Sequence, residues 1–210
     1  MIKRIFCCLC LLLLGVSINA QSQEPGKLKY EALLEKVKAG DTTVNFKDLR
    51  MAYTESPGYS PYGGDGEAGK SMFAALKDKD YNKALGYADT ILKQKYVDIF
   101  AHMVSALAYT ELKNAERAKY HQAVVQGMIQ SILKSGDGKS IETAYVVIAT
   151  DEEYALFNAL GLRRGSQSLV KDKDHNYDRM DAVDRKTNET STLYFNIDIP
   201  FNWLSKSLKK

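Results

Sequence analysis

FAALKDKDYNKALGYADTI, residues 73–91, is followed 34 residues later by a second stretch of similar pattern, LAYTELKNAERAKYHQAVV, residues 107–125. The residues that match across this offset include Lys79 with Lys113, Asp80 with Asn114, Lys83 with Arg117, Ala84 with Ala118 and Ile91 with Val125. Apolar residues recur at helical spacing throughout, and small alanines stand where two helices can approach closely. The repeat therefore predicts successive helical hairpins over residues 72–134.

The 34-residue period resembles that of tetratricopeptide repeats, in which each unit is a helix pair that stacks on its neighbours. The match is degenerate, because the Trp, the Gly and the terminal Pro of a consensus unit are missing. Two units are also fewer than the roughly three that such an array needs to bury a core. We therefore expect another part of the chain to complete the core.

Two helices are predicted before the repeat. Residues 27–39 carry apolar side chains at helical spacing and are followed by Gly40, which can end a helix in the left-handed conformation. Asn45 is expected to cap a second, short helix. Residues 57–69 are rich in Gly, Pro and Tyr, so they are interpreted as a loop that leads into a helix starting near Met72.

The C-terminal third is expected to supply the rest of the core. Its β-branched and aromatic runs predict strands at residues 143–149, 166–171, 177–185 and 192–199. Thr150 and Glu153 have the spacing of a capping box for a helix over residues 151–160. Apolar residues after the last strand are expected to close the core.

The predicted fold is therefore α+β, with degenerate tetratricopeptide-like hairpins packed on a small antiparallel sheet that carries one helix. Residues 21–210 are predicted to form a single domain, with a helical part at 27–134 and a β-containing part at 135–210. A chain of this length is long enough to bury a core of its own.

The first twenty residues have the layout of a secretory signal peptide. Lys3 and Arg4 precede a mainly apolar run, Ile5 to Ile18, that is too short to span a bilayer comfortably, and Ala20 is the small residue expected at a cleavage point. All three cysteines lie inside this segment. We therefore expect a cysteine-free mature protein that is exported, periplasmic or secreted, and soluble.

The charge balance limits the possible partners. Without Lys3 and Arg4 the chain keeps 27 basic and 26 acidic residues, a net charge of about +1. A nearly neutral chain with interspersed signs lacks the basic surface typical of nucleic-acid binding. No second apolar run approaches the roughly 20 residues needed to cross a membrane. The expected partner is an unknown protein or peptide.

Several short motifs resemble one family of exported bacterial proteins. They are FKDLRMAY at residues 46–53, YSPY at 59–62, SGDG at 135–138, ETA at 142–144, EEY at 152–154 and YFNI at 194–197. The family is domain of unknown function 4919, and the resemblance covers nearly all of the chain after the signal. It implies one intact domain and no assigned activity.

One motif matches the phosphate-binding pattern G-x-x-x-x-G-K-[ST]. Its defining positions are Gly64, Gly69, Lys70 and Ser71. Such a loop needs an apolar strand before it and a parallel α/β sheet around it, whereas the preceding SPGYSPYG cannot be a central strand. The match is therefore interpreted as chance, and no cofactor is expected.

His102 and His121 fall on adjacent antiparallel helices of the repeat. They are candidates for a shared polar pocket or for two ligands of a metal, but a metal site needs at least one more nearby ligand, which the sequence does not identify. The favoured interpretation is that both histidines form hydrogen bonds in the core.

Four acidic residues after the repeat are the weak candidates for catalysis. Asp137, Glu142, Glu152 and Glu153 would together bind a cation or polarise a substrate if the fold brought them to one place. In the favoured alternative, Asp137 belongs to a turn after a helix, and Glu152 and Glu153 are first-turn residues stabilised by the helix dipole.

The sequence favours a binding or interaction module. Stacked helix pairs present a concave surface, and the chain contains no G-x-S-x-G or H-E-x-x-H motif and no cysteine outside the signal. Two alternatives stay open, namely an uncharacterised hydrolase or metal-dependent enzyme that uses the acidic residues near Asp137, and a structural component of the envelope. The balance leans away from an enzyme.

Overall fold

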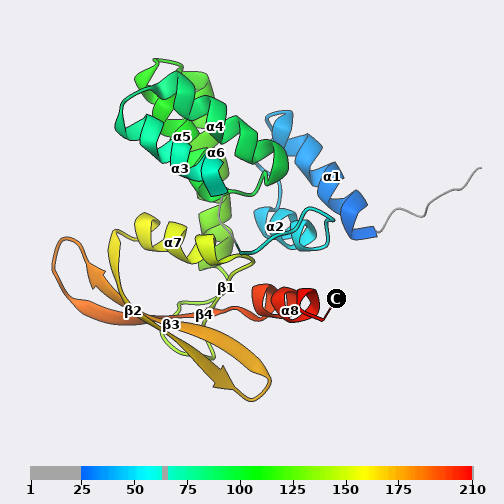
Figure 1. The fold of residues 1–210 in the computed structure, drawn as a ribbon, viewed down its shortest axis with the longest axis vertical. Helices are drawn as coiled ribbons and strands as arrows, with labels where there is room; N and C mark the ends of the chain where they lie inside the picture. The colour runs from blue at the N-terminus through cyan, green and yellow to red at the C-terminus, as the bar shows by residue number, and fades with distance from the viewer. Residues whose placement is uncertain (1–24, 63–65, 210) are drawn as a thin grey trace, which may run out of the picture.

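The computed structural model of the chain describes residues 25–62 and 66–209. Its elements in chain order are α1 (Pro25–Lys38), α2 (Phe46–Thr54), α3 (Gly66–Lys77), α4 (Tyr81–Gln94), α5 (Ile99–Glu111), α6 (Ala115–Leu133), β1 (Tyr145–Val146), α7 (Thr150–Ala159), β2 (Leu162–Asp172), β3 (His175–Asp184), β4 (Thr190–Asn196) and α8 (Asp198–Ser207). Figure 1 shows the helical part above the sheet, with α7 between them. The predicted α+β class is confirmed, while the predicted signal peptide lies outside the described residues.

The two hairpins α3–α4 and α5–α6 repeat each other in backbone detail. Lys79 and Lys113, which occupy equivalent turn positions, both have φ of 60°, a left-handed conformation that L residues rarely adopt. Asp80 and Asn114 then cap the second helix of each hairpin, and each side chain accepts from the main-chain N–H three residues later at 3.1 Å. The predicted 34-residue repeat is therefore a repeat of structure.

The helices before and at the start of the repeat follow local signals. Gly40 has φ of 98° after α1, and the side chain of Asn45 accepts from the N–H of Asp48 at 3.2 Å to cap α2. The expectation that α3 starts near Met72 was wrong, because α3 begins at Gly66. Good helix formers between these positions outweigh the glycine content of the segment.

The sheet has the strand order β1-β4-β3-β2. β2 with β3 and β3 with β4 are antiparallel, as predicted, but β1 pairs in parallel with β4. The predicted strand 143–149 was too long, because only Tyr145–Val146 forms a strand. The residues that follow are buried as core, and only the N–H of Val147 among them still bonds to β4, at 3.3 Å from the main-chain oxygen of Asn196, before the chain turns into α7.

The predicted capping box of α7 was wrong. Ala149 is the N-cap residue and makes no side-chain cap bond, while Thr150 is already helical. The hydroxyl of Thr150 lies 3.4 Å from the main-chain oxygen of Pro61, and Glu153 is fully buried. Tertiary contacts on both sides of α7 therefore engage the side chains of Thr150 and Glu153, and the two residues do not form a capping box.

The last strand ends earlier than predicted. Leu193, Phe195 and Ile197 alternate on the covered side of the sheet as expected, and all three are buried. Strand β4 stops at Asn196, however, and α8 starts at Asp198, whose Oδ1 accepts from the main-chain N–H of Asn176 at 2.8 Å. This contact ties the start of α8 to β3.

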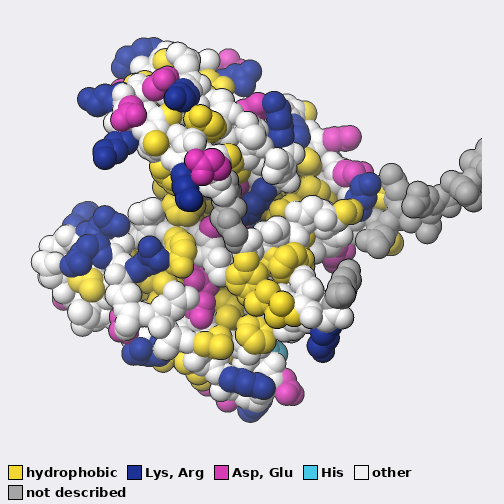
Figure 2. Space-filling model, in the orientation of Figure 1, with side chains coloured by type: hydrophobic (Ala, Val, Ile, Leu, Met, Phe, Trp, Pro, Cys, Tyr) yellow, Lys and Arg dark blue, Asp and Glu magenta, His cyan; other side chains and the backbone are white. Residues whose placement is uncertain are grey.

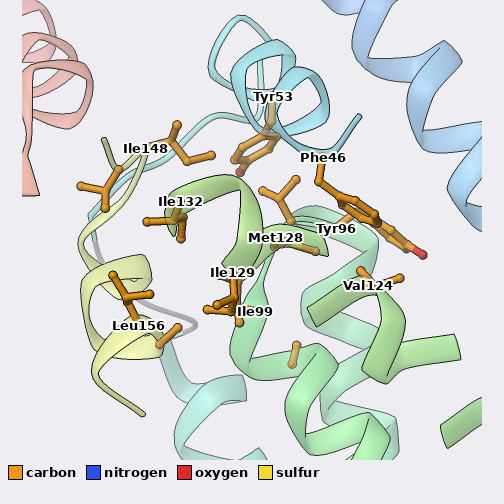
Figure 3. Packing of buried hydrophobic residues seen from close by; sticks show 14 of the residues in the cluster. Phe46, Tyr53, Tyr96, Ile99, Val124, Met128, Ile129, Ile132, Ile148 and Leu156 are labelled. Atoms are coloured by element: carbon orange, nitrogen blue, oxygen red, sulfur yellow. The ribbon is translucent and has the colours of Figure 1, made fainter. Parts of the chain in front are cut away.

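One hydrophobic cluster joins the helices to the sheet. In Figure 3, Met128 of α6 lies at the centre of the cluster below Tyr53 of α2, and Ile132 of α6 lies near Ile148 and Leu156. Figure 2 shows hydrophobic side chains gathered at the centre of one face and Lys and Arg side chains over the helical hairpins. None of the described helices is long and apolar enough to cross a membrane.

Candidate functional site, a histidine pocket on the helical hairpins

His102 on α5 and His121 on α6 face each other inside the second hairpin. Their Nδ1 atoms are 2.8 Å apart, and Nε2 of His102 lies 2.9 Å from the main-chain oxygen of Tyr96. His102 is fully buried, whereas His121 is 8% exposed. The fold therefore brings these two sequence candidates into direct hydrogen-bond contact.

The hydrogen-bond partners determine which ring nitrogen carries each proton. The oxygen of Tyr96 can only accept, so Nε2 of His102 donates to it and Nδ1 of His102 is left as an acceptor. Nδ1 of His121 is then the donor between the rings, and Nε2 of His121 keeps a lone pair. That Nε2 has no hydrogen-bond partner within 25–62 and 66–209. The chain of hydrogen bonds from Tyr96 through His102 thus ends at Nε2 of His121, an acceptor that no described residue uses.

The surroundings hold both rings in the neutral form. Burial, together with the neighbouring His121, lowers the pKa of His102 to about 3. Burial and then the positive charge of Arg117 lower the pKa of His121 to about 4. At neutral pH the pair is uncharged, so the Nε2 acceptor of His121 is available.

His121 opens into a pocket of about 330 Å³ between α1, α4, α5 and α6. We call it the histidine pocket. Its aromatic, histidine and charged lining residues are Tyr96, Tyr109, Tyr120, His121, Lys38, Lys93, Arg117 and Asp89. A volume of this size suits a small molecule or one side group of a larger partner.

Aromatic rings and cations form the walls of the histidine pocket. The ring of Tyr109 stacks on His121 with centroids 5.6 Å apart and an interplanar angle of 21°. Lys38 lies 5.3 Å from the ring centroid of Tyr96, and the guanidinium of Arg117 lies 5.7 Å from that of Tyr109. The pocket therefore combines flat apolar surfaces with positive charge at its rim.

The histidine pair does not come with a metal-binding set. No group of three or more His, Cys, Asp or Glu side chains that could hold a metal occurs among the described residues. Nε2 of His102 is also engaged by Tyr96, which leaves one free ring nitrogen in the pair. The geometry therefore favours a hydrogen-bonding role for His102 and His121.

Asp137 and Glu142 lie in the exposed loop between α6 and β1. Oδ1 of Asp137 accepts from the hydroxyl of Thr143 at 2.6 Å and from the N–H of Lys139 at 3.0 Å, and these bonds lower its pKa. A side-chain hydrogen bond with Ser140 is the main cause that lowers the pKa of Glu142. The carboxylates of Asp137 and Glu142 therefore form hydrogen bonds with neighbouring residues of this loop and stabilise its turn.

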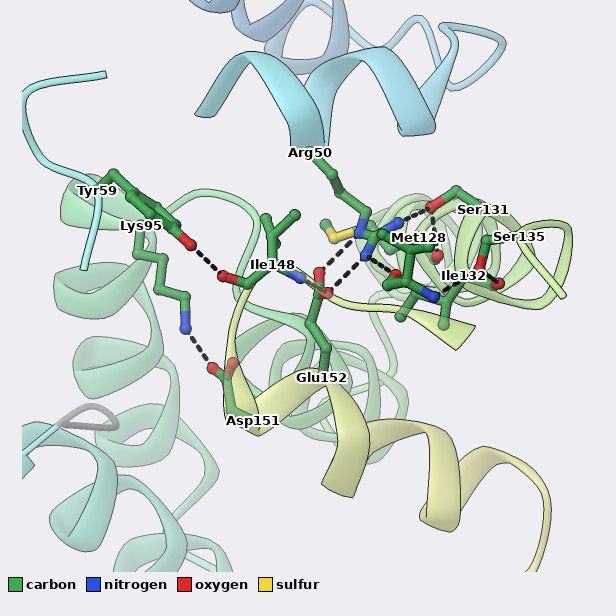
Figure 4. A network of polar contacts seen from close by, with 11 residues as sticks. Arg50, Tyr59, Lys95, Met128, Ser131, Ile132, Ser135, Ile148, Asp151 and Glu152 are labelled. Atoms are coloured by element: carbon green, nitrogen blue, oxygen red, sulfur yellow. Dashed lines mark hydrogen bonds and ion pairs between the residues drawn. The ribbon is translucent and has the colours of Figure 1, made fainter. Parts of the chain in front are cut away.

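Glu152 belongs to a buried ion-pair network (Figure 4). Its two carboxylate oxygens accept from Nε and Nη2 of Arg50 at 2.7 and 2.6 Å, and Oε2 also accepts from the N–H of Ile148 at 2.8 Å. Arg50 further donates to Ser131 at 3.0 Å and to the main-chain oxygen of Val146 at 3.1 Å. The network joins α2, α6, β1 and α7, which is a structural role.

Glu153 is next to Glu152 in sequence but points elsewhere. It is fully buried beside Asp178 of β3, while Glu152 faces Arg50. Since Asp137 and Glu142 are exposed in a loop, the four predicted acidic residues do not form one cluster. An enzyme built on that cluster loses its structural basis.

The phosphate-binding motif is not a loop in its described part. Gly69, Lys70 and Ser71 lie inside α3, where main-chain N–H groups are used within the helix rather than curled around a phosphate. Gly64 lies outside the described residues. The helical conformation agrees with the interpretation of the match as chance.

Sequence reasoning singled out the histidines but missed the residues around them. Tyr96, Tyr109 and Arg117 come from three different elements or turns, so their convergence depends on how the hairpins stack. One usable signal was present, because Tyr109 and Arg117 lie on either side of the turn that joins α5 to α6. Residues at such positions meet when the two helices fold back on each other.

The family model for domain of unknown function (DUF4919) matches residues 18–206 of the chain. The protein therefore belongs to this family of α+β proteins, as the sequence motifs suggested. Comparisons with curated proteins and with solved structures gave no match. The function has to be argued from the residues themselves.

Proposed function

We propose that the protein is a binding module whose ligand enters the histidine pocket and donates a hydrogen bond to Nε2 of His121. The observation that carries this proposal is the bond chain from Tyr96 through His102, which fixes His121 as a neutral acceptor at an open pocket. His102 and His121 are buried, and His121 lines the cavity while its Nε2 lone pair has no partner among the described residues; this is a costly arrangement for packing alone. The arrangement of His102 and His121 is well suited to binding a ligand that donates a hydrogen bond.

The location and organisation are part of the same proposal. We infer that residues 21–210 work as one domain after export, because the signal-like segment precedes residue 21 and one hydrophobic cluster joins the helices to the sheet. The unknown protein or peptide partner expected from the helical repeat would then present a small group to the histidine pocket.

The test is an NMR titration with a panel of sugars, sugar acids, amino acids, dipeptides and nucleotides, read at the imidazole nitrogens of His121. A pocket ligand is expected to shift Nε2 in a saturable manner. His121→Phe and, separately, Tyr109→Ala should abolish that binding while the protein stays folded. Lys119→Gln, a charge change on the same helix outside the pocket, is the matched control.

The outcome is decisive in either direction. If no panel member shifts His121, or if every shift persists in both pocket variants, the proposed function is wrong. Tyr109→Ala keeps the test valid should His121→Phe fail to fold, because Tyr109 is only half-buried.

A further inference from the structure

The inner wall of the histidine pocket offers acceptors, because its protons are already committed to the protein. The hydroxyl of Tyr120 donates to the main-chain oxygen of Val37 at 2.9 Å, so the hydroxyl of Tyr96, which contacts it, donates to Tyr120. The hydroxyl of Ser105 donates to the main-chain oxygen of Ala101 at 2.8 Å. Lone pairs remain on Ser105 and on Tyr96.

Nε2 of His121 adds a third acceptor to this wall. A ligand that fills the pocket must therefore bring several hydrogen-bond donors, since a donor-poor ligand would leave these acceptors without water or partner. Hydroxyl groups and ammonium groups are the two common donors of this kind.

The charge at the rim of the histidine pocket distinguishes between hydroxyl and ammonium donors. Lys38, Lys93 and Arg117 line the pocket, and the single acidic lining residue, Asp89, is paired with Lys93 at 2.6 Å. An ammonium group would meet this excess of positive charge, whereas an anionic group would be attracted by it. The rim therefore favours a ligand that has neutral hydroxyl donors and a negative charge.

Tyr109 links the wall and the rim. Its hydroxyl oxygen lies 3.5 Å from Nη1 of Arg117, and its own proton is free to donate to an anion beside that guanidinium. Its ring is held in place by stacking on His121, with the guanidinium of Arg117 5.7 Å from its centroid, so its hydroxyl is fixed between the wall and the rim.

We propose that the histidine pocket binds a sugar acid, with the hydroxyl groups on the wall formed by His121, Tyr96 and Ser105 and the carboxylate at Arg117. This inference rests on the proposed binding function, and it assigns the pocket a sugar acid in place of a group from a protein or peptide partner. The same chemistry occurs in a free sugar acid and at the end of an acidic polysaccharide. The pocket dimensions, about 330 Å³, match one such ring.

The experiment measures binding of D-glucuronate by calorimetry, with D-glucose as the uncharged probe and hexanoate as the probe without hydroxyls. Glucuronate is expected to bind at least about tenfold more tightly than either. Arg117→Gln should reduce glucuronate affinity to that of glucose and leave glucose binding unchanged. Lys119→Gln should leave all three affinities unchanged.

A further pair of probes, oligogalacturonate and galacturonate, identifies the source of the sugar acid. Oligogalacturonate that binds more tightly than galacturonate indicates a polysaccharide end, and equal binding indicates the free acid; both results support the inference. Hexanoate that binds as tightly as glucuronate overturns it, as does the absence of glucuronate binding to the folded protein. If another panel ligand then shifts Nε2 of His121, the binding function stands and only the sugar-acid inference fails.

Discussion

Glu153 is a carboxyl group without exposure to solvent, at the contact between α7 and the sheet. Burial is the main cause that raises its pKa to about 9, followed by the charge of Asp178, a hydrogen bond with Asp178, and the charges of Asp151 and Glu152. Glu153 is buried close to Asp178, whose carboxylate accepts from Nε2 of Gln167 at 2.8 Å. At neutral pH Glu153 is therefore uncharged in the folded protein.

This pair makes stability depend on pH. The unfolded chain releases the proton of Glu153 near pH 4.5, while the folded protein keeps it up to about pH 9. The free energy of unfolding should therefore fall as the pH rises through this window. Glu153→Gln should flatten the fall in urea denaturation at about pH 5, 7 and 8.5, and Glu142→Gln, an exposed control, should not. An unchanged slope in Glu153→Gln would contradict the assignment.

The sequence predicted the histidines better than it predicted the acids. His102 and His121 were expected to be near each other because their helices are adjacent and antiparallel. Glu152 and Glu153 were interpreted as first-turn residues stabilised by the helix dipole, because nothing in the local pattern shows that α7 is enclosed on two sides. One faces Arg50 and the other faces Asp178, and both partners are distant in sequence.

At the scale of elements, the two hairpins share a left-handed lysine in their turns. Lys79→Gly and Lys113→Gly should each stabilise the protein by up to about 1 kcal/mol, because glycine adopts positive φ without the steric cost that a Cβ atom brings. Thermal denaturation of the two variants is the measurement, and Lys119→Gly inside α6 is the control, expected to destabilise. If the two substitutions changed the stability in opposite directions, the two turns would not be energetically equivalent, although their backbones match.

The Arg50–Glu152 pair connects elements that local signals do not connect. Arg50→Met leaves the carboxylate of Glu152 buried without its partner, so unfolding in urea should become easier by about 3–5 kcal/mol. Adding Glu152→Leu should recover much of the loss, because the pair is then replaced by apolar contacts. Lys93→Met, which breaks an exposed pair with Asp89, should stay near the wild type. A mild effect of Arg50→Met would refute the role of the network.

Elements with strong periodicity were predicted, and those set by tertiary contacts were not. The four helices of the repeat and the hairpin β3–β4 follow from spacing. The break between β4 and α8 does not, because the alternation of Leu193 to Ile197 continues into Ile199. Pro200 was a usable signal, since proline is tolerated in the first turn of a helix and not in a central strand.

At the scale of the whole molecule, the family match extends over residues 18–206 and thus covers both the helices and the sheet. The mature protein is predicted to begin at or near Gln21, because Ala20 is the small residue that closes the apolar run. Mass spectrometry of the protein recovered outside the cytoplasm is the measurement. A chain that retains Met1 would contradict the export proposal.

The two hairpins have matching turn and cap conformations, and this match bears on how the histidine pocket can be changed. The positions equivalent to Tyr109, Arg117 and His121 in the first hairpin are Ala75, Lys83 and Tyr87. The turn lysines, caps and alanines that set the backbone are common to both hairpins, whereas the proposed ligand contacts at Tyr109, Arg117 and His121 have no identical counterpart in the first hairpin. Under the proposed binding function, these three positions of the second hairpin can be substituted to change ligand specificity while the residues that set its backbone stay the same.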